Sequence, residues 1–121
     1  MAIIHDHYDM LLVSKATSGA SGSAEVEGDR IIDIEETGGL EGSQLVLTCP
    51  AANQALTLEV LGCDTEDGEF ETVLEFKTTA STEFSYRERT PLNCPRFIKL
   101  KVTNGATAPS TPVEAVLRFA C

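Results

Sequence analysis

Arg96-Phe97-Ile98-Lys99-Leu100-Lys101-Val102-Thr103-Asn104-Gly105 is the stretch of sequence that decides the fold class of this chain. Every second residue from Ile98 to Val102 is aliphatic, and the positions between them hold lysines, with Phe97 just before. A period of two is typical of a strand with one face in a core and the other at a wetter surface. The run ends at Asn104-Gly105, a turn-forming dipeptide, so the stretch predicts one half-buried strand.

Similar alternating runs recur along the chain at intervals of about ten residues, between clusters of Gly, Pro, Asn and Asp. No segment has the 3.6-residue period of an amphipathic helix. Short strands at this spacing are typical of a sandwich or barrel. The 121 residues therefore predict one all-β domain. We expect an antiparallel β-sandwich, jelly-roll-like, of about eight strands, with an extended N-terminal arm at residues 1–9.

The expected strands are residues 10–14, 30–34, 44–49, 55–63, 72–78, 83–87, 96–103 and 113–119. Two connections carry further expectations. The small residues 16–23, Ala-Thr-Ser-Gly-Ala-Ser-Gly-Ser, predict a flexible loop. Asp67-Gly68 predicts a turn between two strands, after which Phe70 is expected to fold back over the core.

Charge is distributed unevenly along the chain, whose formal net charge is -10. Residues 1–76 hold 16 acids and 2 bases, whereas residues 77–121 hold 3 acids and 7 bases. A strongly acidic domain repels phosphate backbones and anionic membranes, so we expect neither as a partner. Two interpretations of the asymmetry are open. A basic edge could dock on an acidic neighbour, or strands from the two halves could interleave so that the charges mix, which is the simpler expectation.

The cysteines are Cys49, Cys63, Cys94 and Cys121, and no two of them form a C-x-x-C pair. Structural zinc sites normally use such close pairs, so the spacing argues against zinc. Residues 1–13 place histidines and aspartates where a signal peptide would be apolar. We therefore expect reduced thiols that pack as small apolar residues. No apolar run is long enough to span a bilayer.

Two segments have the residue types of a metal site, but neither has the required spacing. His5 and His7 lie two apart and would point to opposite sides of an extended arm. Residues 64–71 hold five carboxylates, yet Gly68 stands fifth where a calcium-binding loop needs glycine sixth. A hydrolytic triad needs a serine or cysteine near a histidine. The two histidines of the chain both lie in the arm, which argues against such a triad. We expect no metal, no cofactor and no enzymatic activity.

One basic cluster stands out: Arg87, Arg89, Arg96, Lys99 and Lys101, interleaved with Phe84, Tyr86 and Phe97. Arginine and aromatic residues in this mixture fit either a nucleic-acid face or the centre of a protein interface. The global negative charge favours the protein interface or a solvated sheet face.

From residue 56 to residue 119, the order of features resembles the small jelly-roll cement, or decoration, proteins of tailed-bacteriophage capsids of the Bordetella-phage type. The matching segments are Gly62-Cys63-Asp64-Thr65, Phe70-Glu71-Thr72, Arg96-Phe97-Ile98-Lys99-Leu100, Gly105 and Val113-Glu114-Ala115, with Leu12-Val13-Ser14 and Ile32-Asp33-Ile34 upstream. The four cysteines and the acidic residues 25–41 have no counterpart among these motifs.

The resemblance implies a structural virion protein, assembled in the host cytoplasm, that binds the outside of the capsid shell. It would reinforce contacts between major capsid protein subunits and associate with itself as a homodimer or another small symmetric oligomer. The residues expected to bind partners are Ile3, Ile4, His5, His7 and Tyr8 in the arm, and Arg87, Arg89, Phe97, Lys99 and Lys101 in the basic cluster.

Two other functions remain open at this point. A carbohydrate-binding jelly-roll module would stack sugars on exposed aromatic side chains, but the chain has no Trp, two Tyr and five Phe. A small sandwich enzyme of the cupin type would need a clustered His/Glu metal site inside the barrel.

Overall fold

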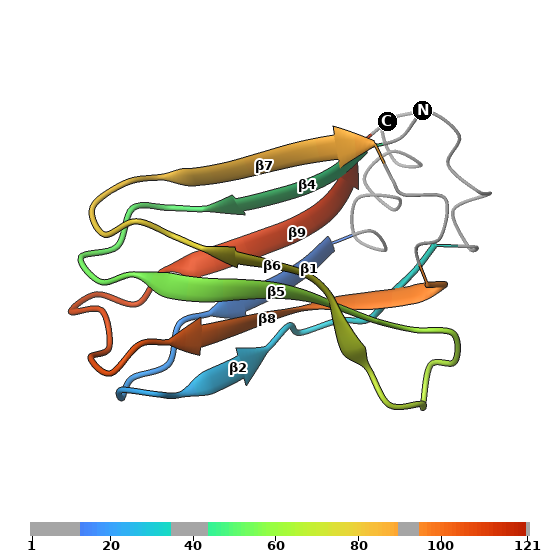
Figure 1. The fold of residues 1–121 in the computed structure, drawn as a ribbon, viewed down its shortest axis with the longest axis horizontal. Coiled ribbons are helices and arrows are strands. Elements are labelled where there is room, and N and C mark those ends of the chain that lie inside the picture. The colour runs from blue at the N-terminus through green and yellow to red at the C-terminus, as the bar shows by residue number, and fades with distance from the viewer. Residues whose placement is uncertain (1–12, 35–43, 90–94, 121) are drawn as a thin grey trace, which may run out of the picture.

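Two antiparallel β-sheets packed face to face form the structure, a computed structural model that describes residues 13–34, 44–89 and 95–120 (Figure 1). The described part contains nine strands and no helix. The strands are β1 (Val13–Thr17), β2 (Glu25–Glu27), β3 (Ile32–Asp33), β4 (Gln44–Cys49), β5 (Leu56–Cys63), β6 (Glu71–Lys77), β7 (Phe84–Arg89), β8 (Phe97–Asn104) and β9 (Glu114–Ala120). The predicted all-β antiparallel sandwich is confirmed.

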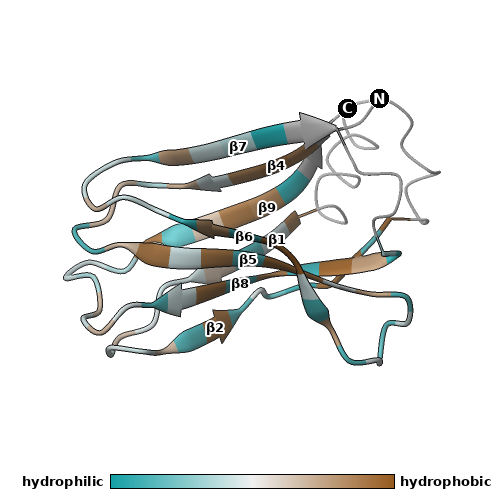
Figure 2. Ribbon diagram, viewed as in Figure 1, coloured by the Kyte–Doolittle hydropathy of each residue, from teal (hydrophilic) through white to brown (hydrophobic). Residues whose placement is uncertain are grey.

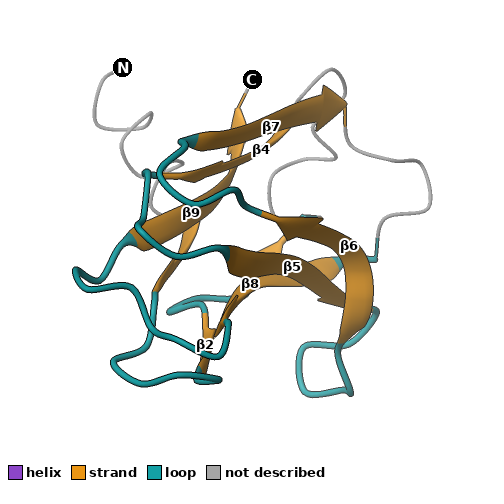
Figure 3. Cartoon of the chain, turned by 60° about the vertical axis from the view of Figure 1, so that its left-hand side comes forward, coloured by secondary structure: helices purple, strands orange, loops and turns teal. Residues whose placement is uncertain are grey.

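Strands from the two halves of the chain lie side by side in both sheets. One sheet has the order β1-β9-β4-β7, and the other has the order β2-β8-β5-β6, with β3 also paired to β8. If β2 and β3 are taken as one interrupted strand, the eight strands have the order of a jelly roll. The predicted interleaving of the two halves is therefore confirmed, and the two layers are visible in Figure 3.

β8 is the strand predicted from the quoted stretch, and it pairs with three others. β5 lies on one side of it and β2 and β3 on the other, all antiparallel. Ile98, Leu100 and Val102 are fully buried. Asn104 is the last residue of β8, as the turn dipeptide predicts.

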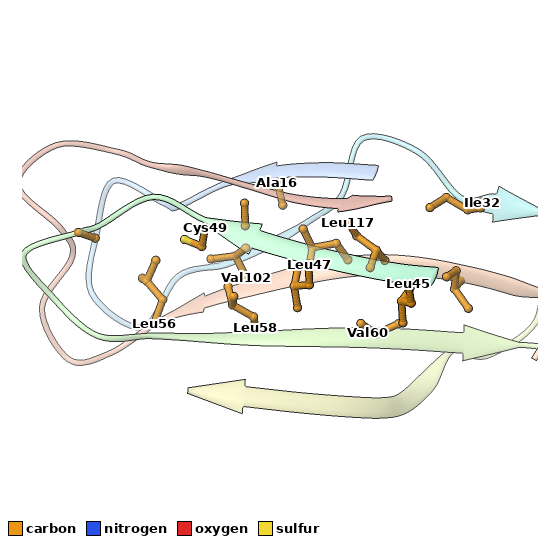
Figure 4. Packing of buried hydrophobic residues seen from close by; sticks show 14 residues of the cluster. Ala16, Ile32, Leu45, Leu47, Cys49, Leu56, Leu58, Val60, Val102 and Leu117 are labelled. Atoms are coloured by element: carbon orange, nitrogen blue, oxygen red, sulfur yellow. The ribbon is translucent and has the colours of Figure 1, made fainter. Parts of the chain in front are cut away.

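The core fills the space between the two sheets and is built from alternate residues of each strand (Figure 4). Leu45, Leu47 and Cys49 of β4 face Leu58 and Val60 of β5 across this space. Such alternation buries one face of each strand and leaves the other face to polar residues. Figure 2 shows the corresponding apolar and polar bands along the strands. Alternate residues of β5 and β9 are buried in the same way, namely Leu56, Leu58, Val60, Ala115 and Leu117.

An aromatic cluster closes the side of the sandwich where the edge strands β6 and β7 lie. The ring centroid of Phe76 is 4.5 Å from that of Tyr86 and 5.4 Å from that of Phe84, and all three rings pack against the core. The prediction that Phe84 and Tyr86 interleave with a basic surface is therefore wrong. Their positions in β7 alternate with Ser85 and Arg87, which puts the rings on the inner face.

The small-residue segment is held in place along most of its length, in contrast to its predicted flexibility. Ala16 lies within β1 and is 3% exposed. Ser18 exchanges two hydrogen bonds with the backbone of Val113, at 2.8 and 3.0 Å. The side-chain amide of Asn104 donates to the carbonyl oxygens of Gly19 and Ser21. Composition alone misses these bonds because their partners lie far away in the sequence.

Other predicted boundaries and placements differ from the structure. The first strand starts no later than Val13 and runs on to Thr17, and residues 10–12 of its predicted range lie outside the described part. The strand β2 was not predicted, because a single Val26 between two glutamates gives no recognisable period. Phe70 does not cover the core. It lies against the outer face of the second sheet, next to Lys99.

Candidate partner-binding surface

The predicted basic cluster does not form one surface. Arg87 and Arg89 belong to β7 in the first sheet, whereas Phe97, Lys99 and Lys101 belong to β8 in the second. Because the two sheets pack with their inner faces together, outward residues of β7 and β8 lie on opposite sides of the molecule. The arm residues Ile3, Ile4, His5, His7 and Tyr8 lie outside the described residues.

Lys99 is engaged within its own sheet face. Its Nζ lies 3.1 Å from a carboxylate oxygen of Glu27 and 4.5 Å from the ring centroid of Phe70. The Lys99 side chain is 15% exposed. An ammonium group over an aromatic ring and beside a carboxylate is already stabilised on two sides. It therefore has little capacity left for an incoming partner.

Lys101 is also engaged, by carboxylates on the strands to either side. Its Nζ lies 3.8 Å from Glu25 on β2 and 3.9 Å from Glu59 on β5. Glu59 also accepts a 2.7 Å hydrogen bond from the hydroxyl of Thr72 on β6. This network links four neighbouring strands through their outward side chains. Its role is to stabilise the sheet, since cross-strand pairs of opposite charge favour this pairing.

Phe97 points outward as predicted, but it is only 8% exposed. The guanidinium of Arg96 lies 4.8 Å from its ring centroid and donates two hydrogen bonds to the carboxylate of Asp33, at 2.9 and 3.0 Å. A bidentate pair of this kind fixes the guanidinium plane. Phe97 is thus part of a local stack, and its predicted exposure is wrong.

The outer face of the first sheet has a different charge. One row of residues in register crosses all four strands: Val13 on β1, Arg118 on β9, Val46 on β4 and Arg87 on β7. The next row begins with Lys15, opposite Val116. Among the outward residues of this sheet whose side chains are described, the charged ones are Lys15, Arg87, Arg118 and Glu114.

The expectation that the charges mix is therefore wrong for the outer face of the first sheet. The second sheet carries both signs on its outward residues, Glu25, Glu27, Glu59, Glu75, Lys77, Lys99 and Lys101. The first sheet carries three bases and one acid among the outward residues whose side chains are described. Sequence reasoning missed Lys15 and Arg118 because each stands alone in the sequence. Their strand alternation, with Ala16 and Leu117 inward, is the signal that could have placed them.

A hollow of about 410 Å³ opens to solvent beside the second sheet. It lies between the segment joining β2 to β3 and the loop joining β5 to β6. Its lining residues are Glu27, Gly28, Asp29, Arg30, Ile31, Glu66 and Lys99. The described residues contain no group of three or more His, Cys, Asp or Glu that could hold a metal ion, either here or in the acidic loop. Lys99 is taken by Glu27 and Phe70, so the hollow does not offer a free cation at that point.

The two described cysteines, Cys49 and Cys63, are free thiols. Cys49 lies in the core, and burial raises the pKa of its thiol. A thiol with a raised pKa is neutral and unreactive near neutral pH. Cys49 is therefore a packing residue, whereas Cys63 is half-buried and its Sγ lies 3.7 Å from the hydroxyl of Thr65. Cys94 and Cys121 lie outside the described residues.

No helix in the described ranges is both long and apolar enough to cross a membrane.

The chain matches no protein-family model, and no curated protein matches its sequence. Its fold is similar to that of a crystal structure of PirA, with a TM-score of 0.52. The two chains are 11% identical, and the alignment covers 90% of this chain and 94% of that one. At this identity the likeness concerns the sandwich fold alone.

Proposed function

We propose that this protein is a structural component of a tailed-phage virion that binds the outside of the capsid shell and reinforces contacts between major capsid protein subunits. The proposal is supported by the jelly-roll order of the two sheets together with the sequence motifs that resemble the cement proteins. Gly62-Cys63-Asp64-Thr65 spans the end of β5, and Phe97 to Leu100 begins the central strand β8.

The mechanical properties of the fold suit this role. The core side chains Leu47, Leu58, Ile98, Leu100 and Leu117 are all fully buried. Close packing of this kind resists deformation, so the domain can transmit force between the subunits it contacts. A shell presents the same site many times, and a small oligomer that engages several sites gains avidity from contacts that are weak singly.

Carbohydrate binding is the alternative function, and the aromatic side chains weigh against it. Sugar-binding sandwiches stack sugars on exposed rings. In the described part of the chain, Phe76, Phe84 and Tyr86 pack against the core, Phe70 lies beside Lys99, and Phe97 lies beneath Arg96. No described ring is left as an open stacking platform. A reproducible hit on a glycan array would restore this alternative.

The direct test is to mix the purified protein with undecorated capsid shells from the same source. We expect saturable co-sedimentation with a fixed number of copies per shell, and an increase in the temperature at which the shell comes apart. A variant lacking residues 1–9 tests the arm, and we expect it to bind more weakly. Shells that neither retain the protein nor gain thermal stability would contradict the proposed function.

A further inference from the structure

The surplus of positive charge on the outer face of the β1-β9-β4-β7 sheet is unusual for a chain of net charge -10. We call this surface the basic face and define it by Val13, Lys15, Val46, Arg87, Val116 and Arg118, which share the outward side of the sheet. Glu114 is the one acid among the described outward residues of the same sheet.

The basic face combines cations with aliphatic positions in a regular pattern. Arg118 stands opposite Val13 on one side and Val46 on the other, and Lys15 stands opposite Val116. Val46 is only 2% exposed and Val13 and Val116 are half-buried, so the exposed groups of this face are mainly its cations. Neither Lys15 nor Arg118 forms an ion pair with any other described residue. Their charges are therefore available to an incoming carboxylate.

The opposite face offers no such surface. There Lys99 is paired with Glu27, and Lys101 lies between Glu25 and Glu59. These ion pairs occupy Lys99 and Lys101 within the sheet, and the face carries Glu75 as well as Lys77, so it has no surplus of positive charge. An acidic partner is therefore attracted to the outer face of the first sheet and not to that of the second.

We propose that the basic face is the docking surface of this protein and that its partner is a carboxylate-bearing protein surface. The argument is charge complementarity. That the partner is the capsid shell rests on the proposed function. That the face binds carboxylates does not, because it follows from the charges of the face. A nucleic-acid partner is disfavoured because the rest of the chain is strongly acidic and no described aromatic side chain stands open on this face to stack a base.

The first experiment uses poly-L-glutamate as the carboxylate probe, at low and physiological salt. The variant K15E/R118E reverses two cations of the basic face. The control K77E/R30E makes the same change in net charge at exposed positions elsewhere, and neither of its residues has an ion-pair partner in the described part. We expect the wild type to bind in a salt-dependent manner and K15E/R118E to bind about tenfold more weakly. The control should change by less than about twofold.

Two results would overturn the assignment of this face. One is an equal loss of binding in K15E/R118E and K77E/R30E, since only net charge would then matter. The other is tighter binding of duplex DNA than of poly-L-glutamate through Lys15 and Arg118, which would change the class of partner. Circular dichroism and melting curves of both variants establish that each is folded before binding is compared.

The second experiment repeats the comparison with capsid shells and separates the two proposals. If the wild type binds shells and K15E/R118E does not, both the function and the docking face are supported. If K15E/R118E binds shells as well as the wild type does, the docking face is wrong and the function stands. If the wild type does not bind shells but binds poly-L-glutamate through Lys15 and Arg118, the proposed function is contradicted and the docking surface is supported.

Discussion

The side-chain amide of Asn104 donates a 2.8 Å hydrogen bond to the carbonyl oxygen of Ser21, a residue 83 positions earlier in the chain. A second bond, of 2.9 Å, runs from the same amide nitrogen to the carbonyl of Gly19. The backbone N–H of Asn104 donates to Ala24. Asn104 is 4% exposed, so these bonds form out of contact with bulk water. One side chain thus fixes the connection between the two sheets.

The substitution Asn104→Asp tests this arrangement with almost no change in shape. The introduced carboxylate would face two carbonyl oxygens without a proton to donate. We expect the free energy of unfolding at pH 7 to fall by about 3 kcal/mol, the cost of an unsatisfied buried group with added charge. The loss should shrink at low pH, where the introduced carboxyl is protonated and can donate one hydrogen bond. Urea unfolding at several pH values measures both effects.

Asn53→Asp is the matched control for that substitution. Asn53 is exposed, and its side-chain oxygen accepts a hydrogen bond from the backbone N–H of Ser110. A carboxylate keeps this acceptor, so we expect a change of less than about 0.5 kcal/mol. Equal losses in the two variants would show that the amide of Asn104 has no special role.

Two glycines near the same connection are expected to differ in how much a substitution by alanine destabilises the fold. A Cβ added at Gly22 would collide with the carbonyl oxygen of Ala106. A Cβ added at Gly105 would meet only the carbonyl oxygen of Ala55, at an ordinary distance of 3.7 Å. We therefore expect Gly22→Ala to destabilise the fold by about 1–3 kcal/mol. Gly105→Ala should change the stability by less than about 1 kcal/mol. Thermal or urea unfolding of the two variants makes the comparison, and a larger loss at Gly105 would contradict it.

These sites show what the sequence could predict and what it could not. The alternation of apolar and polar residues predicts the positions of β4, β5 and β8 closely, because a strand with one buried face has apolar residues at every second position. The partners of Asn104 lie in a segment whose composition predicted flexibility. Nothing local in residues 16–23 reveals a long-range hydrogen bond, so only the fold could show that the segment is held.

The spatial arrangement of the basic residues could likewise not be predicted from the sequence. Proximity in the sequence predicts that Arg87, Lys99 and Lys101 share one surface. The jelly-roll order places them on different sheets. It also brings Lys15 and Arg118, 103 positions apart in the sequence, into adjacent rows of one face. The surface charge of a sandwich follows from strand order, which the residues of a single strand do not encode.

Cys49 is expected to make stability depend on pH in the alkaline range. Burial raises the pKa of its thiol above the ordinary value of 9.0. The unfolded chain therefore loses this proton first, and the folded chain becomes less stable as the pH rises above 9.0. The stabilising contribution is fully present below that pH. We expect the unfolding free energy of the wild type to fall more steeply with pH than that of Cys49→Ala, which lacks the titrating group.

Alkylation at neutral pH provides an independent measurement on the same thiol. Cys63 is half-buried, whereas Cys49 is 3% exposed. Mass spectrometry of the native protein should find label on Cys63 well before Cys49, and denaturant should remove the difference. Rapid labelling of Cys49 in the folded chain would contradict its place in the core.

The last prediction concerns Lys99, which the structure assigns to stability and not to docking. Lys99→Met keeps an apolar stem next to Phe70 but loses the ammonium group, and with it the ion pair to Glu27. We expect the free energy of unfolding to fall by about 1 kcal/mol. The contact with the ring contributes about 0.5–1 kcal/mol, and the ion pair to the half-exposed carboxylate contributes about 1 kcal/mol or less. Lys99→Ala also removes the stem, so its loss should be larger.

A double-mutant cycle between Lys99→Met and Phe70→Leu isolates the aromatic contact. If the ammonium group is attracted to the ring, the two losses are not additive, and the coupling should be about 0.5–1 kcal/mol. This coupling should survive high salt, whereas the coupling between Lys99→Met and Glu27→Gln should decrease, because salt screens exposed ion pairs. Binding to poly-L-glutamate should be the same for Lys99→Met and the wild type. A clear loss of binding in that variant would return Lys99 to the docking surface and weaken the case for the opposite sheet.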